Sequence, residues 1–461
     1  MDYILERIKS INDVINGIVW GPYMLLFLLF VGLFFTVCSG FFQVKHFKLC
    51  FKNTIGSLFK ISSKQKENKQ GISAFQAMTT ALAGAIGTGN VVGVATAIAL
   101  GGPGSIFWMW IAAIVGMMTI FAENVLGVKY RKVNSKGEVV GGPMYYIEYG
   151  LKQKWLAVLF AIFCIFATLG MGNMTQANSI AAAMKESFSF EPKYTGVVLC
   201  IISGLIIFGG INRIAKFSEK IVPIMAGFYI IGGLIVIIHN ANTLPSVFRD
   251  IFTNAFSFKS AFGGAAGITA FKAMKYGISR GVFSNEAGLG SSPIVYASSS
   301  EKDPVVQGMW GIFQVFFDTI IGCSITALCI LSSGIPTANR NGAELSNLAF
   351  ASVFGRFGSV FVAISITLFA FATITSWYFY GEKSLEYLIG DKYNVIFKSL
   401  YIVMILFACV IDLNLVWELS DTFNGLMAIP NLIALMLLSK EVIGEIRKYD
   451  KYLKNKRCKS E

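Results

Sequence analysis

Long apolar stretches recur along this 461-residue chain from near its beginning to near its end. Most run for roughly 20 residues between glycine, proline and charged residues, which is the length that an α-helix needs to cross the hydrocarbon core of a bilayer. The chain is therefore predicted to be an all-α polytopic membrane protein with about eleven transmembrane helices. They are expected near residues 18–42, 72–100, 104–128, 155–184, 194–212, 218–239, 264–298, 304–333, 356–380, 394–411 and 414–439.

The low number of charged residues supports membrane insertion, and their positions indicate which partner the basic ones contact. Only 14% of the residues are charged, whereas an ordinary globular domain carries about a quarter. The formal net charge is +13, and the basic residues gather in connecting segments, chiefly 43–70 and 441–461. Basic segments beside spans are retained on the cytoplasmic side and contact anionic lipid headgroups. Membrane lipids are therefore the expected partners of this charge, and nucleic acid is not.

The placement of these basic segments predicts a topology. If 43–70 is inside, the N-terminus is outside, and every later basic segment, including the C-terminal tail, falls on the cytoplasmic side. Setting the first span aside leaves two sets of five that begin on opposite sides of the membrane, which permits an inverted repeat. The expected organisation is an N-terminal helix and basic cytoplasmic loop (1–70), a first half (71–240), a second half (260–440) and a basic cytoplasmic tail (441–461).

The opening spans of the two predicted halves are both interrupted by glycine. The interruptions are Ala83-Gly-Ala-Ile-Gly-Thr-Gly-Asn90 and Ser284-Asn-Glu-Ala-Gly-Leu-Gly-Ser-Ser-Pro293. A glycine costs about 1 kcal/mol relative to alanine inside a helix. Unwinding there exposes N–H groups for a carboxylate and carbonyls for a cation, and paired broken helices point to a transporter's central site. The alternative is close helix packing, because Gly89 and Gly93 have GxxxG spacing.

Charged residues at membrane depth are further candidates. Glu286 lies in the second interruption, and Arg280 precedes it. Such residues cost roughly 2.5 to 3.5 kcal/mol on insertion scales and usually have functional or paired roles. An ion pair between Glu286 and Arg280 that locks the broken helix and a direct contact with ligand are both open. Glu123, Asp318 and Asp421 are additional candidates for gating or structural roles.

Uncharged polar residues gather in two other spans. Asn173 and Gln176 share one helical face in the fourth span, where their amides suit an ammonium or a carboxylate, or bind neighbouring helices together. In the ninth span, hydroxyl oxygens precede Trp377 and suit a hard cation, unless they bond back to their own helix. An aromatic side chain can also wall off a small ligand. The hydroxyl residues are Thr373, Thr375 and Ser376.

An enzymatic function is not expected. Residues 277–281 match GxSxG, but a nucleophile elbow needs a strand, a turn, a helix and a histidine base. The histidines are His46 and His239, which the predicted topology places on opposite faces of the membrane. The sequence also lacks a Walker lysine motif. An ion gradient is therefore the expected source of energy.

Five segments together are specific enough to indicate a family. They are GAIGTGNVVGVATAIALGGPG (84–104), GGPMYYIEYGL (141–151), GMGNMTQANSIA (170–181), SRGVFSNEAGLGSSPI (279–294) and PVVQGMWGIFQVFFDT (304–319). Together they resemble the alanine or glycine:cation symporters, amino acid transporters with the LeuT-like fold of five plus five inverted helices. The resemblance implies symport of alanine or glycine with sodium, or in some members with protons, across the plasma membrane.

The resemblance also implies site residues. The substrate would be held by the two broken helices, by amides of the third core helix and by the aromatic of the ninth span: Gly87, Thr88, Gly89, Asn90, Ser284, Asn285, Gly288, Asn173, Gln176 and Trp377. Sodium, the cofactor ion, would meet carbonyls of the first core helix and hydroxyls of the eighth: Ala83, Ile86, Thr373, Thr375 and Ser376. Three alternatives stay open, namely proton coupling through Glu286 or Glu123, a non-transporting amino acid sensor on the same scaffold, and a channel.

Overall fold

The computed structural model describes residues 2–58, 71–256, 265–337, 340, 342–411 and 414–458. Within them, helices coincide with every predicted span, so the all-α polytopic fold class is confirmed. The helices at the predicted spans are α2 (Pro22–Cys38), α6 (Ala74–Ala85), α7 (Val94–Gly101), α8 (Gly104–Lys129), α10 (Lys154–Leu169), α11 (Thr175–Phe188), α12 (Pro192–Ile207), α13 (Gly210–His239), α15 (Ala265–Asn285), α16 (Ser292–Ala297), α17 (Pro304–Val315), α18 (Ser324–Ser332), α20 (Arg356–Ile389), α21 (Asn394–Val410) and α22 (Asn414–Leu437).

The number of spans differs from the prediction of about eleven when length and composition are the criteria. Seven described helices are long and apolar enough to cross a membrane, or up to nine if each bent pair is one span. The difference has a physical source, because α12 has only 16 residues and the span at 264–298 is interrupted. Residues 59–70 of the predicted cytoplasmic loop and 260–264 of the predicted second half lie outside the described residues.

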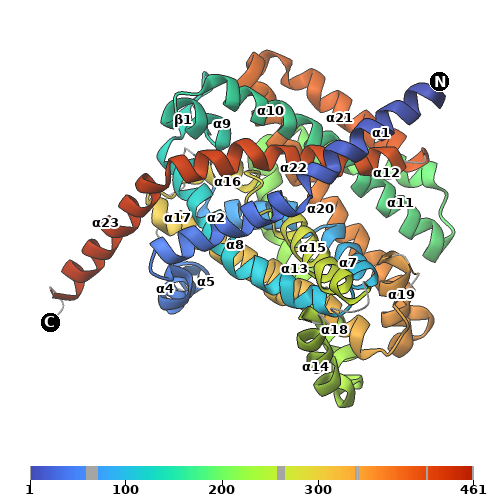
Figure 1. Cartoon of the computed structure of the whole chain (residues 1–461). Coiled ribbons are helices and arrows are strands. Elements are labelled where there is room, and N and C mark those ends of the chain that lie inside the picture. The colour runs from blue at the N-terminus through green and yellow to red at the C-terminus, as the bar shows by residue number, and fades with distance from the viewer. Residues whose placement is uncertain are drawn as a thin grey trace.

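Shorter elements connect and flank these helices. They are α1 (Asp2–Val19), α3 (Phe42–Lys45), α4 (Phe47–Asn53), α5 (Ile55–Leu58), α9 (Pro143–Tyr145), α14 (Leu244–Ala255), α19 (Gly342–Phe354), α23 (Ser439–Cys458), the 3-10 turns η4 (Ala241–Thr243) and η6 (Asp391–Tyr393), and the antiparallel strands β1 (Lys132–Val133) and β2 (Val139–Val140). Figure 1 shows α22 crossing the bundle and α23 leaving it at the edge where α4 and α5 lie.

The bundle buries polar residues at its centre and exposes apolar ones outside. Helices α8, α10, α15, α17 and α20 form the interior, where α8 packs against α15 and α17, and α10 packs against α20 and α22. Large apolar side chains on the outer helices are exposed, among them Leu26, Phe30, Ile201, Leu205, Ile235, Ile238, Val403 and Phe407. This distribution suits a protein whose surrounding solvent is lipid.

Four interior segments are wound as π-helices. They are η1 (Gly89–Gly93), η2 (Tyr146–Gly150), η3 (Gly170–Met174) and η5 (Phe316–Cys323). A π-turn shifts hydrogen bonding from four residues to five and often marks a functional region. Three of these segments, η1, η3 and η5, carry or adjoin residues predicted from the sequence to form the site.

Candidate functional site

The first broken helix ends where the sequence predicts an interruption. Helix α6 stops at Ala85, Ile86 leaves the helical conformation with ψ 89°, and the segment from Gly89 runs on at an angle of 51°. The last carbonyls of a helix have no intrahelical donor. Side chains of α20 reach two of them, because Trp377 Nε1 donates to Gly84 O at 3.3 Å and Thr373 Oγ1 lies 3.1 Å from Ala83 O.

Four oxygen atoms converge at this break. Thr373 Oγ1 lies 3.1 Å from Ala83 O, 3.4 Å from Ile86 O and 3.1 Å from Phe369 O in its own helix. One hydroxyl hydrogen can serve only one of these three carbonyls at full strength. The set therefore has oxygen lone pairs to spare, and two of its carbonyls, those of Ala83 and Ile86, lie at the unwound end of a half-helix, an arrangement that can bind a cation.

The other predicted cation ligands in α20 have different contacts. Thr375 Oγ1 donates to Ala372 O of its own helix at 2.9 Å, which is the back-bonding alternative considered for the sequence. Thr373 Oγ1 has such a contact too, with Phe369 O, but Thr375 forms no hydrogen bond with the first break in the described part of the chain. The Ser376 hydroxyl is buried and has no hydrogen-bond partner within the described residues. Sequence reasoning missed Phe369, although its position four residues before Thr373 puts its carbonyl on the same helical face.

Glycine is required at the break because other groups approach it closely. A β-carbon at Gly87 would lie 2.7 Å from Thr373 Oγ1 and 3.3 Å from Gln176 Oε1. Gln176 Oε1 accepts from the Thr88 N–H at 3.4 Å, and its Nε2 donates to Met171 O at 3.0 Å. The amide predicted to read the substrate is thus placed at the first break.

Asn173 lies elsewhere, contrary to the predicted shared face. Its Nδ2 donates to Tyr401 O of α21 at 2.7 Å. The spacing argument assumed a regular α-helix, whereas η3 covers Gly170–Met174 and its wider turns rotate Asn173 away from Gln176. The structure therefore gives Asn173 the interhelical contact that was the alternative interpretation of the sequence.

The second broken helix turns sharply between α15 and α16. Glu286 has φ 62°, Gly288 φ 92° and Gly290 φ 82°. These are left-handed conformations that glycine adopts readily and a residue with a β-carbon adopts rarely. The turn brings Glu286 inward, where its carboxylate is fully buried.

The ion pair between Glu286 and Arg280, one of the two interpretations left open for the sequence, does not form in the structure. Glu286 instead accepts from Trp377 Nε1 at 2.9 Å and from Ser291 Oγ at 2.5 Å. Arg280 Nη1 lies 3.9 Å from Asp421 Oδ1 on α22. Six residues along a helix of 3.6 residues per turn point in different directions, and α15 ends before Glu286 is reached. Trp377 consequently contacts both breaks, through Gly84 O and Glu286.

Asp318 joins polar residues of the two breaks. It lies on η5, and its Oδ1 accepts from Asn90 Nδ2 at 2.8 Å. Its Oδ2 accepts from Ser284 Oγ at 2.9 Å and from Thr319 Oγ1 at 2.8 Å. Asn285 Nδ2 donates to Thr319 Oγ1 at 3.0 Å. The predicted substrate residues Asn90, Ser284 and Asn285 are thus held by one buried acid and its neighbour.

Glu123 of α8 and Asn431 of α22 bind the backbone of the second break. Glu123 Oε1 accepts from the Gly290 N–H at 3.1 Å and from the Asn431 amide. The same amide donates to Gly288 O at 2.9 Å, and Tyr146 OH donates to Asn431. Like Glu286 and Asp318, Glu123 is fully buried and forms no ion pair in the described part of the chain.

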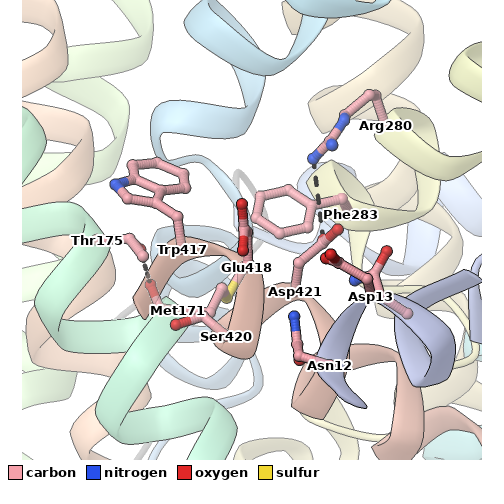
Figure 2. A pocket seen from close by; sticks show the side chains of 11 residues that line it. Asn12, Asp13, Met171, Thr175, Arg280, Phe283, Trp417, Glu418, Ser420 and Asp421 are labelled. Carbon is pink, nitrogen blue, oxygen red and sulfur yellow. Dashed lines mark hydrogen bonds and ion pairs between the residues drawn. The ribbon is translucent and has the colours of Figure 1, made fainter. Parts of the chain in front are cut away.

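A cavity of about 240 Å³ lies between α1, α11, α15 and α22, and Phe283 is among its lining residues. Figure 2 shows its lining, with the contact between Arg280 and Asp421 beside Phe283. A β-carbon at Gly89 would lie 3.5 Å from the Phe283 ring, so this ring separates the cavity from the break. Sequence reasoning missed Phe283, which directly precedes the Ser284 interruption.

Comparisons with known proteins agree on one family. The model of the sodium:alanine symporter family matches residues 5–461. The chain is 42% identical to the sodium/alanine symporter AgcS of Methanococcus maripaludis, over 99% of both chains. It is 39% identical to the probable sodium/glutamine symporter GlnT of Bacillus subtilis, over 98% of this chain and 92% of that one.

A solved structure shows the same fold at low sequence identity. The structure of MhsT in complex with L-phenylalanine aligns with a TM-score of 0.51 at 14% identity, over 82% of this chain and 92% of that chain. The likeness supports the predicted LeuT-like architecture.

Proposed function

The chain belongs to the sodium:alanine symporter family, and on that premise we propose that it couples sodium influx to uptake of alanine or glycine by alternating access. It is a multi-pass membrane transporter and not an enzyme. The observation that carries the proposal is the convergence of Thr373 Oγ1 with the carbonyls of Ala83, Ile86 and Phe369. Sodium would take these oxygens in place of the hydroxyl hydrogen bonds.

The substrate would lie between this cation and the second break. Its carboxylate would accept from the N–H groups that begin the second half-helix, at Thr88, Gly89 and Asn90, where the helix dipole favours negative charge. The contact from Thr88 N to Gln176 Oε1 is long at 3.4 Å, so a charged acceptor would replace it readily. Phe283 stands close to Gly89 and limits the room for a side chain, which favours alanine or glycine over larger amino acids.

The membrane orientation of the chain and the movement of its two halves are part of the same proposal. Halves 71–240 and 260–440 would rock around the two breaks, with the N-terminus outside and the C-terminus in the cytoplasm. The cavity beside Phe283 would then open to the outside, because it is lined by α1 and by the first residues of α22.

Proton coupling is a second candidate that one observation favours. Three buried carboxylates, Glu123, Glu286 and Asp318, accept only neutral hydrogen bonds within the described residues. A buried acid without a cationic partner is stabilised by binding a proton. Glu286 would be the coupling group because its hydrogen-bond donor Trp377 also contacts the first break.

Reconstituted uptake distinguishes these functions. Proteoliposomes containing the purified protein would be offered labelled alanine, glycine or glutamine while sodium, lithium and proton gradients are imposed one at a time. We expect alanine or glycine to accumulate against its gradient only with sodium. If accumulation requires the pH gradient and is independent of sodium, protons are the coupling ion and Glu286 is the proposed coupling group. If glutamine accumulates in preference to alanine and glycine, the proposal of a small substrate is contradicted.

Two variants test the substrate contacts. Gln176→Ala removes the amide oxygen that, once released from the Thr88 N–H, would accept from the substrate ammonium, and it should raise the alanine KM by about tenfold, as expected for one lost hydrogen bond to a charged group. Asn173→Ala is the matched control, because that amide contacts Tyr401 O instead. It should lower thermal stability. The alanine KM should stay within about twofold of wild type, because a substitution away from the substrate usually changes the free energy by less than ~0.5 kcal/mol.

A further inference from the structure

A large basic cavity lies at the edge where the C-terminal helix leaves the bundle. It has a volume of about 870 Å³ and lies between α3, α4 and α23, beside the start of α17. Figure 1 shows α4, α17 and α23 in this region. Helix α17 packs against both α4 and α23, and Asn53 Nδ2 donates to Tyr449 OH at 3.0 Å across the cavity wall. The cavity is therefore bounded by elements far apart in the sequence.

Positive charge dominates the lining of this cavity. Four lysines line it, Lys45, Lys48, Lys52 and Lys456, and none forms an ion pair in the described part of the chain. Two acids lie nearby and are otherwise engaged. Asp303 Oδ1 caps α17 by accepting from Val305 N at 2.9 Å and from Val306 N at 3.3 Å, and Asp450 lies 3.9 Å from His46. The lining thus holds four lysines against one carboxylate, that of Asp303, and this excess of positive charge favours an anionic ligand.

An exposed apolar row adjoins the lysines. On α3, α4 and the residue before them, Phe41 is 49% exposed, Val44 63%, Phe47 41% and Phe51 47%. They recur every three to four residues along the chain, across the two short helices that meet at His46, and the lysines alternate with them in sequence. Phe47 and Phe51 rest edge-on against Phe316 and Phe313 at 5.5 and 6.4 Å between ring centroids. Exposed apolar side chains next to lysines are typical of segments that lie in the membrane interface.

We propose that this cavity binds the phosphate-bearing headgroup of an anionic phospholipid from the cytoplasmic leaflet. The lysines hold the phosphate, while the acyl chains lie along the exposed phenylalanine and valine side chains. A free phosphate would use the lysines alone and gain nothing from those side chains, so the apolar row favours the lipid. The bound lipid joins the α3–α4 segment to α23, and its location rests on the proposed topology.

Native mass spectrometry of the delipidated, detergent-purified protein tests this site. The probes are phosphatidylglycerol and phosphatidylcholine with the same acyl chains, in the presence and absence of inorganic phosphate and glycerol phosphate. We expect retention of one phosphatidylglycerol, at least tenfold tighter than phosphatidylcholine. We also expect millimolar glycerol phosphate or phosphate to displace it poorly, because neither has acyl chains. Equal binding of the two lipids would overturn the proposal, and full displacement by the soluble anions would identify a free-anion site instead.

Charge-matched variants locate the site. Lys48→Gln with Lys52→Gln should weaken phosphatidylglycerol binding by ~30-fold, since each basic residue near anionic lipid contributes on the order of fivefold. The control pair is Lys216→Gln with Lys220→Gln, which removes equal charge from exposed positions on α13 and should change binding by less than about twofold. Lys48→Arg with Lys52→Arg should retain binding, which separates lost charge from misfolding. Equal weakening by both glutamine pairs would show general surface attraction and overturn the site.

Discussion

Thr373→Val offers a sharp test of the cation site because it removes one oxygen and keeps the shape of a fully buried side chain. Thr373 Oγ1 is the one side-chain atom among the four converging oxygens, with carbonyls at 3.1, 3.1 and 3.4 Å. A hydrogen bond or ligand contact to a charged group contributes about 1.5–3 kcal/mol. Its loss should raise the sodium concentration for half-maximal uptake by ~10- to 150-fold.

The assay is labelled alanine uptake into proteoliposomes over a range of sodium concentrations at constant membrane potential. At saturating sodium, the Thr373→Val variant should approach the wild-type rate, because the substrate contacts are intact. Thr375→Val is the matched control, with the same chemistry two residues away, and its hydroxyl bonds to Ala372 O of its own helix. It should shift the sodium dependence by less than about threefold, as expected for loss of a neutral local hydrogen bond. An unchanged sodium dependence in Thr373→Val, or equal shifts in both variants, would refute the assignment of the four oxygens.

Three further outcomes are expected. Gly87→Ala puts a β-carbon 2.7 Å from a side-chain oxygen of α20 and should abolish uptake in vesicles, whereas Gly93→Ala, which meets nothing within 4 Å, should leave uptake unchanged. Burial is the largest single influence on the pKa of Glu138 and raises it, but the Lys383 ammonium at 2.7 Å, Asn134 and Lys136 together lower it more, so the net pKa is below its usual value. The ionised carboxylate therefore stabilises the fold above the unfolded-state pKa of about 4.3 and loses this effect as the pH falls through the lower folded-state pKa; Glu138→Gln should lower the Tm more at pH 7 than at pH 3, in a thermal-shift assay. Cys458 is exposed near the end of α23, so a membrane-impermeant maleimide should label it in inside-out vesicles and not in intact cells, with Cys458→Ser as the control and the reverse pattern contradicting the topology.

Much of the architecture follows from apolar length and from glycine placement. Every predicted span contains a helix, and both predicted interruptions are real, at Ile86 and at Glu286. These features are local: a run of apolar residues needs a helix in lipid, and clustered glycines weaken it. The structure places Gln176 at the first break and Trp377 between both breaks, and their roles toward a substrate stay predictions.

The remaining details depend on tertiary geometry that residue spacing does not encode. Asn173 turns away because η3 is a π-helix, and Arg280 pairs with Asp421 because α15 ends between it and Glu286. Phe369 contributes a backbone carbonyl, which any residue type carries, so its identity gives no signal. Side-chain contacts across the bundle decide each of these cases.

The indole of Trp377 carries one hydrogen atom and faces two acceptors, Gly84 O at 3.3 Å and Glu286 Oε1 at 2.9 Å. A single proton cannot bond both at full strength, so a stronger hydrogen bond to one acceptor means a weaker one to the other. The Gly84 carbonyl and the Glu286 carboxylate therefore compete for the same indole hydrogen, although they belong to two broken helices that are far apart in sequence. A change in the charge or position of either acceptor therefore alters the hydrogen bond at the other through the single N–H group of Trp377.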